Sequence, residues 1–314
     1  MVVLLHCNYF IFGAVLQPEI TANPLNAFGR LFADQICTPC VNLFILISGW
    51  FGIRPKIKGG LSILFQVAFY TLICIGVCYL MKWDISFDKI KAALTCQQAY
   101  WFIWPYLLLY ITAPAFNLLI EKESKKTVLI IILSLLVFEF ALDWIVYYAG
   151  GHGGKSYIAF VTLYLISRML SKYKDDYKLY KGYVYFILFL LFSIMPTALA
   201  FFGEKFIQFQ FGKSAYTNPF VIAASVSLLL CFSTMSFKSR SINWLACSAF
   251  SIYLFHMNPL LSKHFHDILQ ALFNMVGGWY TPLVIAFSLI LGLLCMLFDK
   301  TRILLWSIIV RDKK

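Results

Sequence analysis

Four ionisable side chains interrupt long apolar stretches of this sequence: His6, Glu139, Asp143 and His256. Ionisable groups are costly inside a bilayer, and those that occur there commonly mark functional sites. A polar residue packed against a neighbouring helix is the plainer interpretation for any one of them, but it is less favoured for all four together. We therefore take these four residues as candidates for catalysis.

His6 is the best candidate for a catalytic base. An imidazole titrates near neutral pH, so it can take a proton from a hydroxyl group and pass it on. Glu139 and Asp143 are four residues apart and share one face of a helix, from which a carboxylate could orient the imidazole. His256 is expected at a similar depth in another helix. The sequence leaves open which carboxylate, if either, contacts His6.

The elements that must position these residues are membrane-spanning helices. Of the 314 residues 61% are hydrophobic and 13% charged, whereas soluble domains are about 45–50% apolar and about 25% charged. A bilayer requires apolar segments of about 20 residues that satisfy their own backbone, and these are α-helices. We predict an all-α polytopic membrane protein with about ten transmembrane helices. The expected spans are Val2–Leu16, Ile36–Ile53, Leu61–Met81, Tyr100–Ile120, Thr127–Tyr148, Tyr157–Leu170, Tyr183–Phe202, Asn218–Phe237, Ile242–Ser262 and Pro282–Phe298.

The basic residues favour one orientation of these spans. If the amino terminus is cytoplasmic, most of the 26 lysines and arginines fall in inner loops and in the carboxyl tail beyond residue 298. The positive-inside rule therefore predicts that both termini are cytoplasmic. The net charge of +12 follows from this bias and indicates attraction to anionic membrane lipid. No nucleic-acid partner is expected.

Two short patterns resemble cofactor or metal motifs but lack the context that those motifs require. Residues 149–156 come within one residue of a phosphate-binding loop, yet they join two expected spans rather than a strand and a helix. A flexible turn is expected there. Cys37 and Cys40 form a single C-x-x-C pair, which supplies too few ligands for a zinc site. We predict no metal site.

A series of motifs resembles the acyltransferase 3 family of membrane O-acyltransferases. A first-helix histidine precedes an apolar run that ends in Ser48-Gly-Trp-Phe51 and a basic loop. Trp101-Phe-Ile-Trp-Pro-Tyr106, Ser156-Tyr157 before a Tyr-Leu helix, and Ser251-Ile-Tyr-Leu-Phe-His-Met-Asn-Pro259 follow in the family's order. The resemblance spans nearly the whole chain, so residues 1–314 are expected to form a single transmembrane acyltransferase domain. The motif residues singled out are Ser48, Gly49, Trp101 and Tyr253.

The resemblance implies transfer of an acyl group, usually acetyl, from cytoplasmic acyl-CoA to a hydroxyl of a sugar or lipid-linked glycan. It implies that His6 is catalytic and that acetyl-CoA, or another acyl-CoA, is the donor. It further implies that Arg54, Lys56 and Lys58 contact the phosphates of CoA, although simple orientation of the loop explains these charges as well. The implied location is the bacterial inner membrane, which the chain would cross many times.

The sequence departs from the family at its start. The family usually carries a basic residue about ten positions before the histidine, and only five residues precede His6. We expect either that the first helix is truncated or that this copy has lost part of its site. We also expect the stand-alone form, without the appended hydrolase-like domain of some members.

The alternative to an acyltransferase is a protein that moves its ligand across the membrane. A transporter or flippase for a polysaccharide or polar lipid would explain the intramembrane charges, but it would not explain the family's motifs. Such a protein often consists of two halves related by a repeat, and the sequence shows no such repeat.

Overall fold

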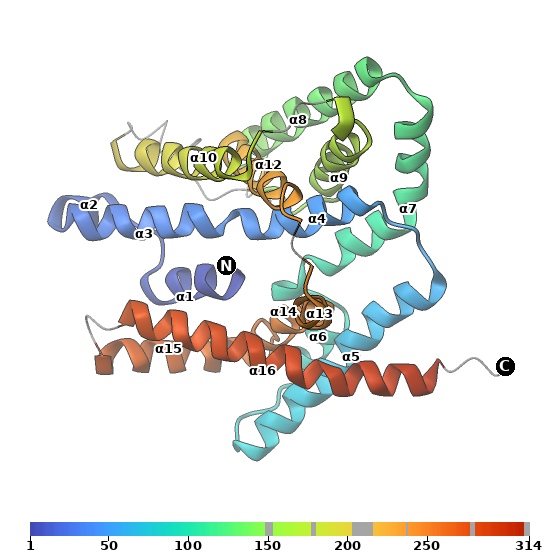
Figure 1. Ribbon diagram of the computed structural model, residues 1–314. Helices are drawn as coiled ribbons and strands as arrows, with labels where there is room; N and C mark the ends of the chain where they lie inside the picture. The colour runs from blue at the N-terminus through green and yellow to red at the C-terminus, as the bar shows by residue number, and fades with distance from the viewer. Residues whose placement is uncertain (148–152, 177–179, 203–215, 237, 277–279, 311–314) are drawn as a thin grey trace. The chain divides into compact units, whose positions relative to one another are not determined.

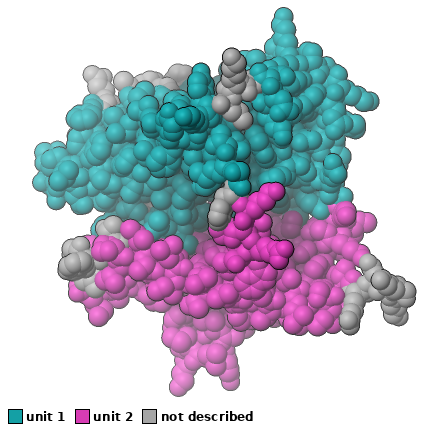
Figure 2. All heavy atoms as spheres, viewed as in Figure 1, with its two compact units in different colours: residues 1–55, 105–236 teal, residues 56–104, 237–314 magenta. Residues whose placement is uncertain are grey.

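The computed structural model describes residues 1–147, 153–176, 180–202, 216–236, 238–276 and 280–310. These residues form helices and no strand, which confirms the all-α prediction. The chain divides into two compact units, shown in different colours in Figure 2. Unit 1 holds residues 1–55 and 105–236, and unit 2 holds residues 56–104 and 237–314. The prediction of a single domain stays a prediction.

The helices of each unit are labelled in Figure 1. Unit 1 contains α1 (Val2–Phe12), α2 (Gln17–Ala22), α3 (Pro24–Cys37), α4 (Pro39–Phe51), most of α7 (Ile103–Lys122), α8 (Lys125–Tyr147), α9 (Tyr157–Lys172), η2 (Lys174–Asp176), α10 (Gly182–Phe202) and α12 (Pro219–Ser233). Unit 2 contains α5 (Ile57–Leu80), α6 (Phe87–Leu94), η1 (Gln98–Tyr100), α13 (Arg240–Ala246), α14 (Phe250–His256), α15 (Ser262–Val276) and α16 (Tyr280–Ile309).

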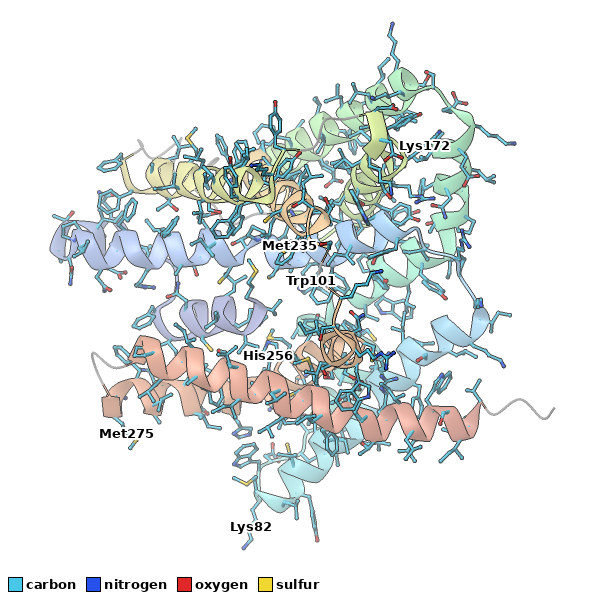
Figure 3. All side chains as sticks on the ribbon, viewed as in Figure 1. Lys82, Trp101, Lys172, Met235, His256 and Met275 are labelled. Atoms are coloured by element: carbon cyan, nitrogen blue, oxygen red, sulfur yellow. The ribbon has the colours of Figure 1, made fainter. Side chains whose placement is uncertain are left out.

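Five stretches of the described chain are long and apolar enough to cross a bilayer. They present large apolar side chains outward (Figure 3), as lipid-facing helices do: Leu72 is 67% exposed and Leu289 is 70% exposed. The prediction of about ten spans and that of cytoplasmic termini stay predictions. The five stretches are Pro24–Phe51, Ile57–Leu80, Ile103–Lys122, Gly182–Phe202 and Pro282–Ile309.

Two of these stretches extend beyond the spans expected from hydropathy. The second expected span begins at Ile36, but the helical stretch begins at Pro24. The last expected span ends at Phe298, but α16 continues to Ile309. Both extensions contain buried charged residues that form ion pairs: Arg30 in the first, and Asp299 and Arg302 in the second. A prediction that ends each span at the first charged residue therefore ends these helices too early. The predicted helix end at Phe298 is therefore too early, whereas the cytoplasmic location of the basic residues beyond it stays a prediction.

The ninth expected span, residues 242–262, is two short helices rather than one. α13 ends at Ala246, and α14 ends at His256, just before Asn258 and Pro259. Proline disfavours helical backbone at the residue before it. The Asn258 side chain accepts a hydrogen bond from Leu260 N at 3.0 Å and donates one to the Tyr100 hydroxyl at 2.9 Å. The motif that ends in Pro259 therefore forms a buried corner on η1.

Close packing of α4 on α9 depends on Gly49. A Cβ atom at that position would lie 2.6 Å from the carbonyl oxygen of Tyr164 and would overlap the hydroxyl of Ser167. Small residues allow membrane helices to approach this closely. The glycine of the Ser48-Gly49 motif thus has a packing role.

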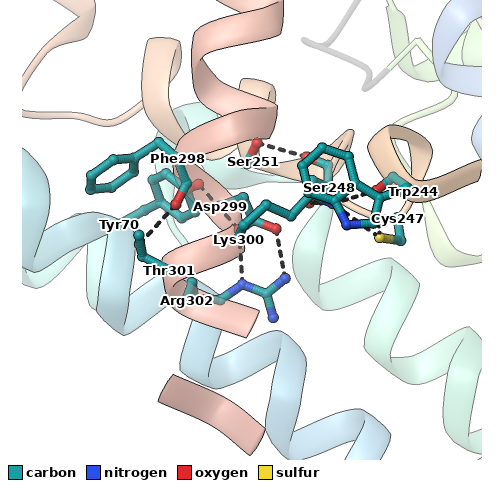
Figure 4. Close-up of polar contacts among 10 residues, drawn as sticks. All are labelled: Tyr70, Trp244, Cys247, Ser248, Ser251, Phe298, Asp299, Lys300, Thr301 and Arg302. Atoms are coloured by element: carbon teal, nitrogen blue, oxygen red, sulfur yellow. Dashed lines mark hydrogen bonds and ion pairs between the residues drawn. The ribbon is translucent and has the colours of Figure 1, made fainter. Parts of the chain in front are cut away.

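In unit 2, Asp299 joins α16 to α5 (Figure 4). Its side chain is 0% exposed and accepts hydrogen bonds from Arg302 Nε at 2.8 Å, Arg302 Nη2 at 2.7 Å and the Tyr70 hydroxyl at 3.1 Å. Lys300 links the same helix to α13, because its Nζ donates to the Trp244 carbonyl oxygen and, at 2.9 Å, to Ser248 Oγ. Each buried charge in this cluster has a partner.

We predict that Gly49→Ala destabilises the protein by about 1–3 kcal/mol, because overpacking forces the helices apart. The measurement is the thermal stability of the detergent-purified protein, followed by size-exclusion chromatography after heating. Gly76→Ala in α5 is the matched control, since a Cβ there meets no atom within 4 Å. If both variants unfold at the same temperature, the close approach of α4 and α9 is wrong.

We predict that Asp299→Ala costs about 3–5 kcal/mol, since it leaves Arg302, only 4% exposed, as a buried charge without its counter-ion. The double variant Asp299→Leu with Arg302→Met removes both charges and should recover most of the loss. The same thermal assay compares the two variants. Equal instability of the single and double variants would argue against a charge-pair role for Asp299.

Candidate functional site

His6 lies in α1, which packs against α3. The side chains of Val3 and Cys7 are buried, whereas His6 is partly exposed. Val3 and Cys7 are one helical turn apart, so they define the packed face of α1, and His6 lies at the side of that face. The imidazole of His6 is therefore not fully covered by the protein.

Polar contacts fix α1 against α3 close to His6. Asn8 Nδ2 donates hydrogen bonds to Asp34 Oδ1 at 2.6 Å and to the Arg30 carbonyl oxygen at 3.2 Å. Arg30 is 9% exposed, donates from Nη2 to the Gly13 carbonyl oxygen at 2.8 Å, and forms an ion pair with Glu19 of α2. These contacts tie three helices together around the start of the chain.

Sequence reasoning missed Arg30 and Asp34, which contact the helix that carries His6 or the turn after it. The expected second span began at Ile36, which assigned both residues to an outer loop. A helix-start signal was nevertheless present, since Pro24 follows Asn23, whose side chain accepts a hydrogen bond from Asn26 N at 3.3 Å. A capping residue followed by proline marks the true beginning of this helix.

Glu139 and Asp143 lie together on α8, as their spacing predicted, and each contacts the start of another helix. Ser156, the N-cap residue of α9, donates to Glu139 Oε1 at 3.1 Å and Oε2 at 3.2 Å. Thr217, just before α12, donates to Asp143. A carboxylate is favourable near the positive end of a helix dipole. Both carboxylates therefore have structural partners other than His6.

The same end of unit 1 contains further polar contacts. Asn42 Nδ2 of α4 donates to the Tyr216 carbonyl oxygen at 3.0 Å, and Tyr216 N donates to the Gly153 carbonyl oxygen at 3.0 Å. Gly154 has a φ of +82°, and a Cβ there would lie 2.9 Å from Thr217 N. The beginnings of α4, α9 and α12 thus meet beside the two carboxylates.

The other end of α4 is a fixed turn that precedes the basic loop. Gly52 has a φ of +75°, which favours glycine. Ile53 N donates to the Tyr164 hydroxyl at 2.9 Å, and Asn117 Nδ2 donates to the Ile53 carbonyl oxygen at 2.9 Å. The Tyr164 hydroxyl donates to Asn117 Oδ1 at 2.8 Å. Arg54 follows this turn and is exposed.

Lys56 and Lys58, the other residues implied to contact CoA, are exposed and belong to unit 2. Their assignment to CoA stays a prediction. Ser48, a motif residue of α4, donates from Oγ to the Phe44 carbonyl oxygen at 2.8 Å and lies 3.2 Å from the Tyr106 hydroxyl. This serine is thus a link between α4 and α7.

His256 belongs to unit 2, whereas the other three catalytic candidates belong to unit 1. Its side chain is buried, and Nδ1 lies 2.5 Å from the Ile252 carbonyl oxygen, which fixes the orientation of the ring. The hydroxyl of the motif residue Tyr253 donates to the Ala99 carbonyl oxygen at 2.5 Å, so Tyr253 links α14 to η1. The ring of the motif residue Trp101 lies 6.0 Å from that of its sequence neighbour Phe102.

Among the residues that the structure describes, no group of three or more His, Cys, Asp or Glu side chains is arranged to hold a metal ion. Cys37 and Cys40 are buried free cysteines. Of the glycine-rich segment 149–156, residues 149–152 lie outside the described residues, and Gly153 and Gly154 form a turn before α9.

The whole chain was also compared with known proteins. The family model Acyl_transf_3, an acyltransferase domain, matches residues 1–298 of the 314. No curated protein and no protein of solved structure gives a significant match. The matched region includes His6, both carboxylates, Ser48, Gly49 and the corner motif at His256. By this match over nearly its full length, the chain belongs to the Acyl_transf_3 family of acyltransferases.

Proposed function

We propose that this protein is a membrane O-acyltransferase that moves an acetyl group from cytoplasmic acetyl-CoA, or another acyl group from its CoA ester, to a hydroxyl of a sugar or polysaccharide. The observation that carries the proposal is the family match, which includes His6 in α1. The five apolar stretches support a membrane location. The bacterial inner membrane, crossed about ten times with both termini in the cytoplasm, is part of the proposal.

His6 acts as the general base in this reaction. It removes the proton of the acceptor hydroxyl while the hydroxyl oxygen attacks the thioester carbonyl carbon. The new C–O ester bond forms, the C–S bond breaks, and the proton held by the imidazole passes to the sulfur of CoA. The products are the acylated acceptor and free CoA thiol, so His6 returns to its neutral state.

Arg30, Asp34 and Asn8 are positioning residues for this base. A general base must lie within hydrogen-bond reach of the proton that it takes. Asn8 is two residues from His6 on α1, and its hydrogen bond of 2.6 Å to Asp34 limits rotation of that helix against α3. The ion pair between Arg30 and Glu19 adds a second link through α2.

The two ends of unit 1 suit the two substrates. At one end of unit 1 the exposed Arg54 after the Gly52 turn supplies positive charge for the phosphates of CoA. Lys56 and Lys58, which begin unit 2, stay part of the proposed set of CoA contacts. The polar end at Glu139 and Asp143 offers hydrogen-bonding groups for a glycan. In this proposal the two carboxylates shape the acceptor side, because Ser156 and Thr217 already hold them.

We predict that His6→Ala lowers acyl transfer by about 10²–10⁴-fold, because a general base contributes rate enhancement of that order. The measurement is the O-acetyl content of the cell-surface glycan in a deletion strain that carries either the wild type or the variant at equal expression. His266→Ala in α15 is the control, because it removes an imidazole that is 43% exposed. The strain that carries this variant should show the wild-type O-acetyl content.

Full acetylation by the His6→Ala strain would overturn the assignment of His6 as the base. Glycan that is missing from the surface, rather than present without acetyl groups, would instead favour a transporter or flippase for a polysaccharide or polar lipid. Release of CoA from acetyl-CoA by the purified protein, measured with a thiol reagent, checks the donor independently.

A further inference from the structure

Arg168 of α9 lies directly against the turn that ends α4. A Cβ atom added to Gly52 would lie 3.0 Å from Arg168 Cζ, 3.2 Å from Nη1 and 3.3 Å from Nε. The guanidinium group therefore occupies the space beside the glycine backbone that a side chain would fill. Gly52 is needed here both for this space and for its φ of +75°.

The charge of Arg168 is not matched by the protein around it. Its Nε is buried and has no hydrogen-bond partner among the residues that the structure describes. Nor does Arg168 form an ion pair with a carboxylate within those residues: Asp176 pairs with Lys125 at 3.6 Å, and Glu121 and Glu123 are exposed at the end of α7. Arg168 as a whole is partly exposed, so a negatively charged ligand can reach its guanidinium and would supply the missing acceptor.

The surroundings of Arg168 are rigid. Tyr164, one turn before it on α9, is fully buried and bonds both to Ile53 N and to Asn117. Lys172, one turn after it, donates from Nζ to the Ile120 carbonyl oxygen. The lysine is thus engaged with α7, while Arg54, two residues beyond Gly52, remains exposed at the same end of unit 1.

We propose that Arg168 and Arg54 bind a phosphate group at the Gly52 turn. A planar guanidinium offers paired N–H donors that match two oxygens of one phosphate. The inference rests on the proposed function for its ligand, which is then a phosphate of the acyl-CoA donor. An anionic phospholipid headgroup presents the same chemistry, so the experiment separates the two sources.

The experiment measures binding of coenzyme A to the full-length protein in phosphatidylcholine nanodiscs by titration calorimetry. We expect Arg168→Ala to raise the Kd for coenzyme A by about 10- to 100-fold, the range for loss of hydrogen bonds to a charged group. Lys174→Ala is the matched control, because it removes one exposed positive charge from η2 and should change the Kd less than about twofold.

A second pair of variants separates ligand binding from folding. Arg168→Lys retains the charge but loses the fork of donors, and it should weaken binding by an intermediate factor. Gly52→Ala keeps the arginine but places a methyl group against the guanidinium, and it should also raise the Kd. The thermal stability of each variant is recorded, and in steady-state kinetics the KM for acyl-CoA should rise more than the KM for the acceptor.

The outcomes distinguish this inference from the proposed function. If the wild type transfers acyl groups but Arg168→Ala retains a normal Kd and KM for the donor and also binds phosphatidylglycerol normally, the phosphate site is wrong and the function stands. If the wild type neither binds coenzyme A nor transfers acyl groups, the proposed function fails. Binding of phosphatidylglycerol vesicles that Arg168→Ala abolishes, with coenzyme A binding unchanged, would retain the phosphate site and overturn its assignment to the donor.

Discussion

The structure depends on one constraint: a polar group that leaves water must find a partner within the protein. A bilayer offers no hydrogen bonds to replace those of water. In unit 2, buried Asp299 has three donors from two side chains, and in unit 1 the α8 carboxylates bond to the starts of α9 and α12. These contacts define which helices pack together, since each charge fixes its element against a specific neighbour. Apolar packing alone would allow neighbouring helices to slide along one another and to rotate about their axes.

A buried polar atom that has no partner within the protein is an exception to this constraint, and it can indicate a missing ligand. The buried Nε of Arg168 has no partner among the described residues, although its neighbour Tyr164 is fully bonded. The Nε atom of Arg30 is also buried without a partner, but the other nitrogens of that guanidinium bond to Glu19 and to the Gly13 carbonyl oxygen. Arg168 has no such protein partner among the described residues, so a ligand would complete it. Glu139 and Asp143 show the opposite case. Both are intramembrane charges by sequence, yet their bonds to Ser156 and Thr217 explain them structurally.

Sequence reasoning found the helical class, the family and the shared face of Glu139 and Asp143, because these follow from apolar length, motif order and helical spacing. It missed Arg30 and Asp34, because a hydropathy profile ends a span where charged residues begin. Such a profile contains no information about side-chain partners, so it cannot predict the hydrogen bond from Asn8 to Asp34. It joined α13 and α14 because the side-chain bonds of Asn258 cannot be read from hydropathy. Helix α15 was missed because its polar positions mask the apolar face that buries Phe265 and Leu269.

The placement of a catalytic base requires more than the burial of its helix. Val3 and Cys7 hold α1 against α3, but apolar contacts resist rotation about the helix axis only weakly. Adjacent residues of an α-helix differ by about 100° around its axis, so a rotation of that size would carry His6 to a different face. The directional bond between Asn8 and Asp34 opposes that rotation. Asp34 belongs to the same helical stretch as Ser48, and this stretch ends at Phe51, just before the Gly52 turn. One stretch therefore relates the base to the end of unit 1 at which Arg168 lies.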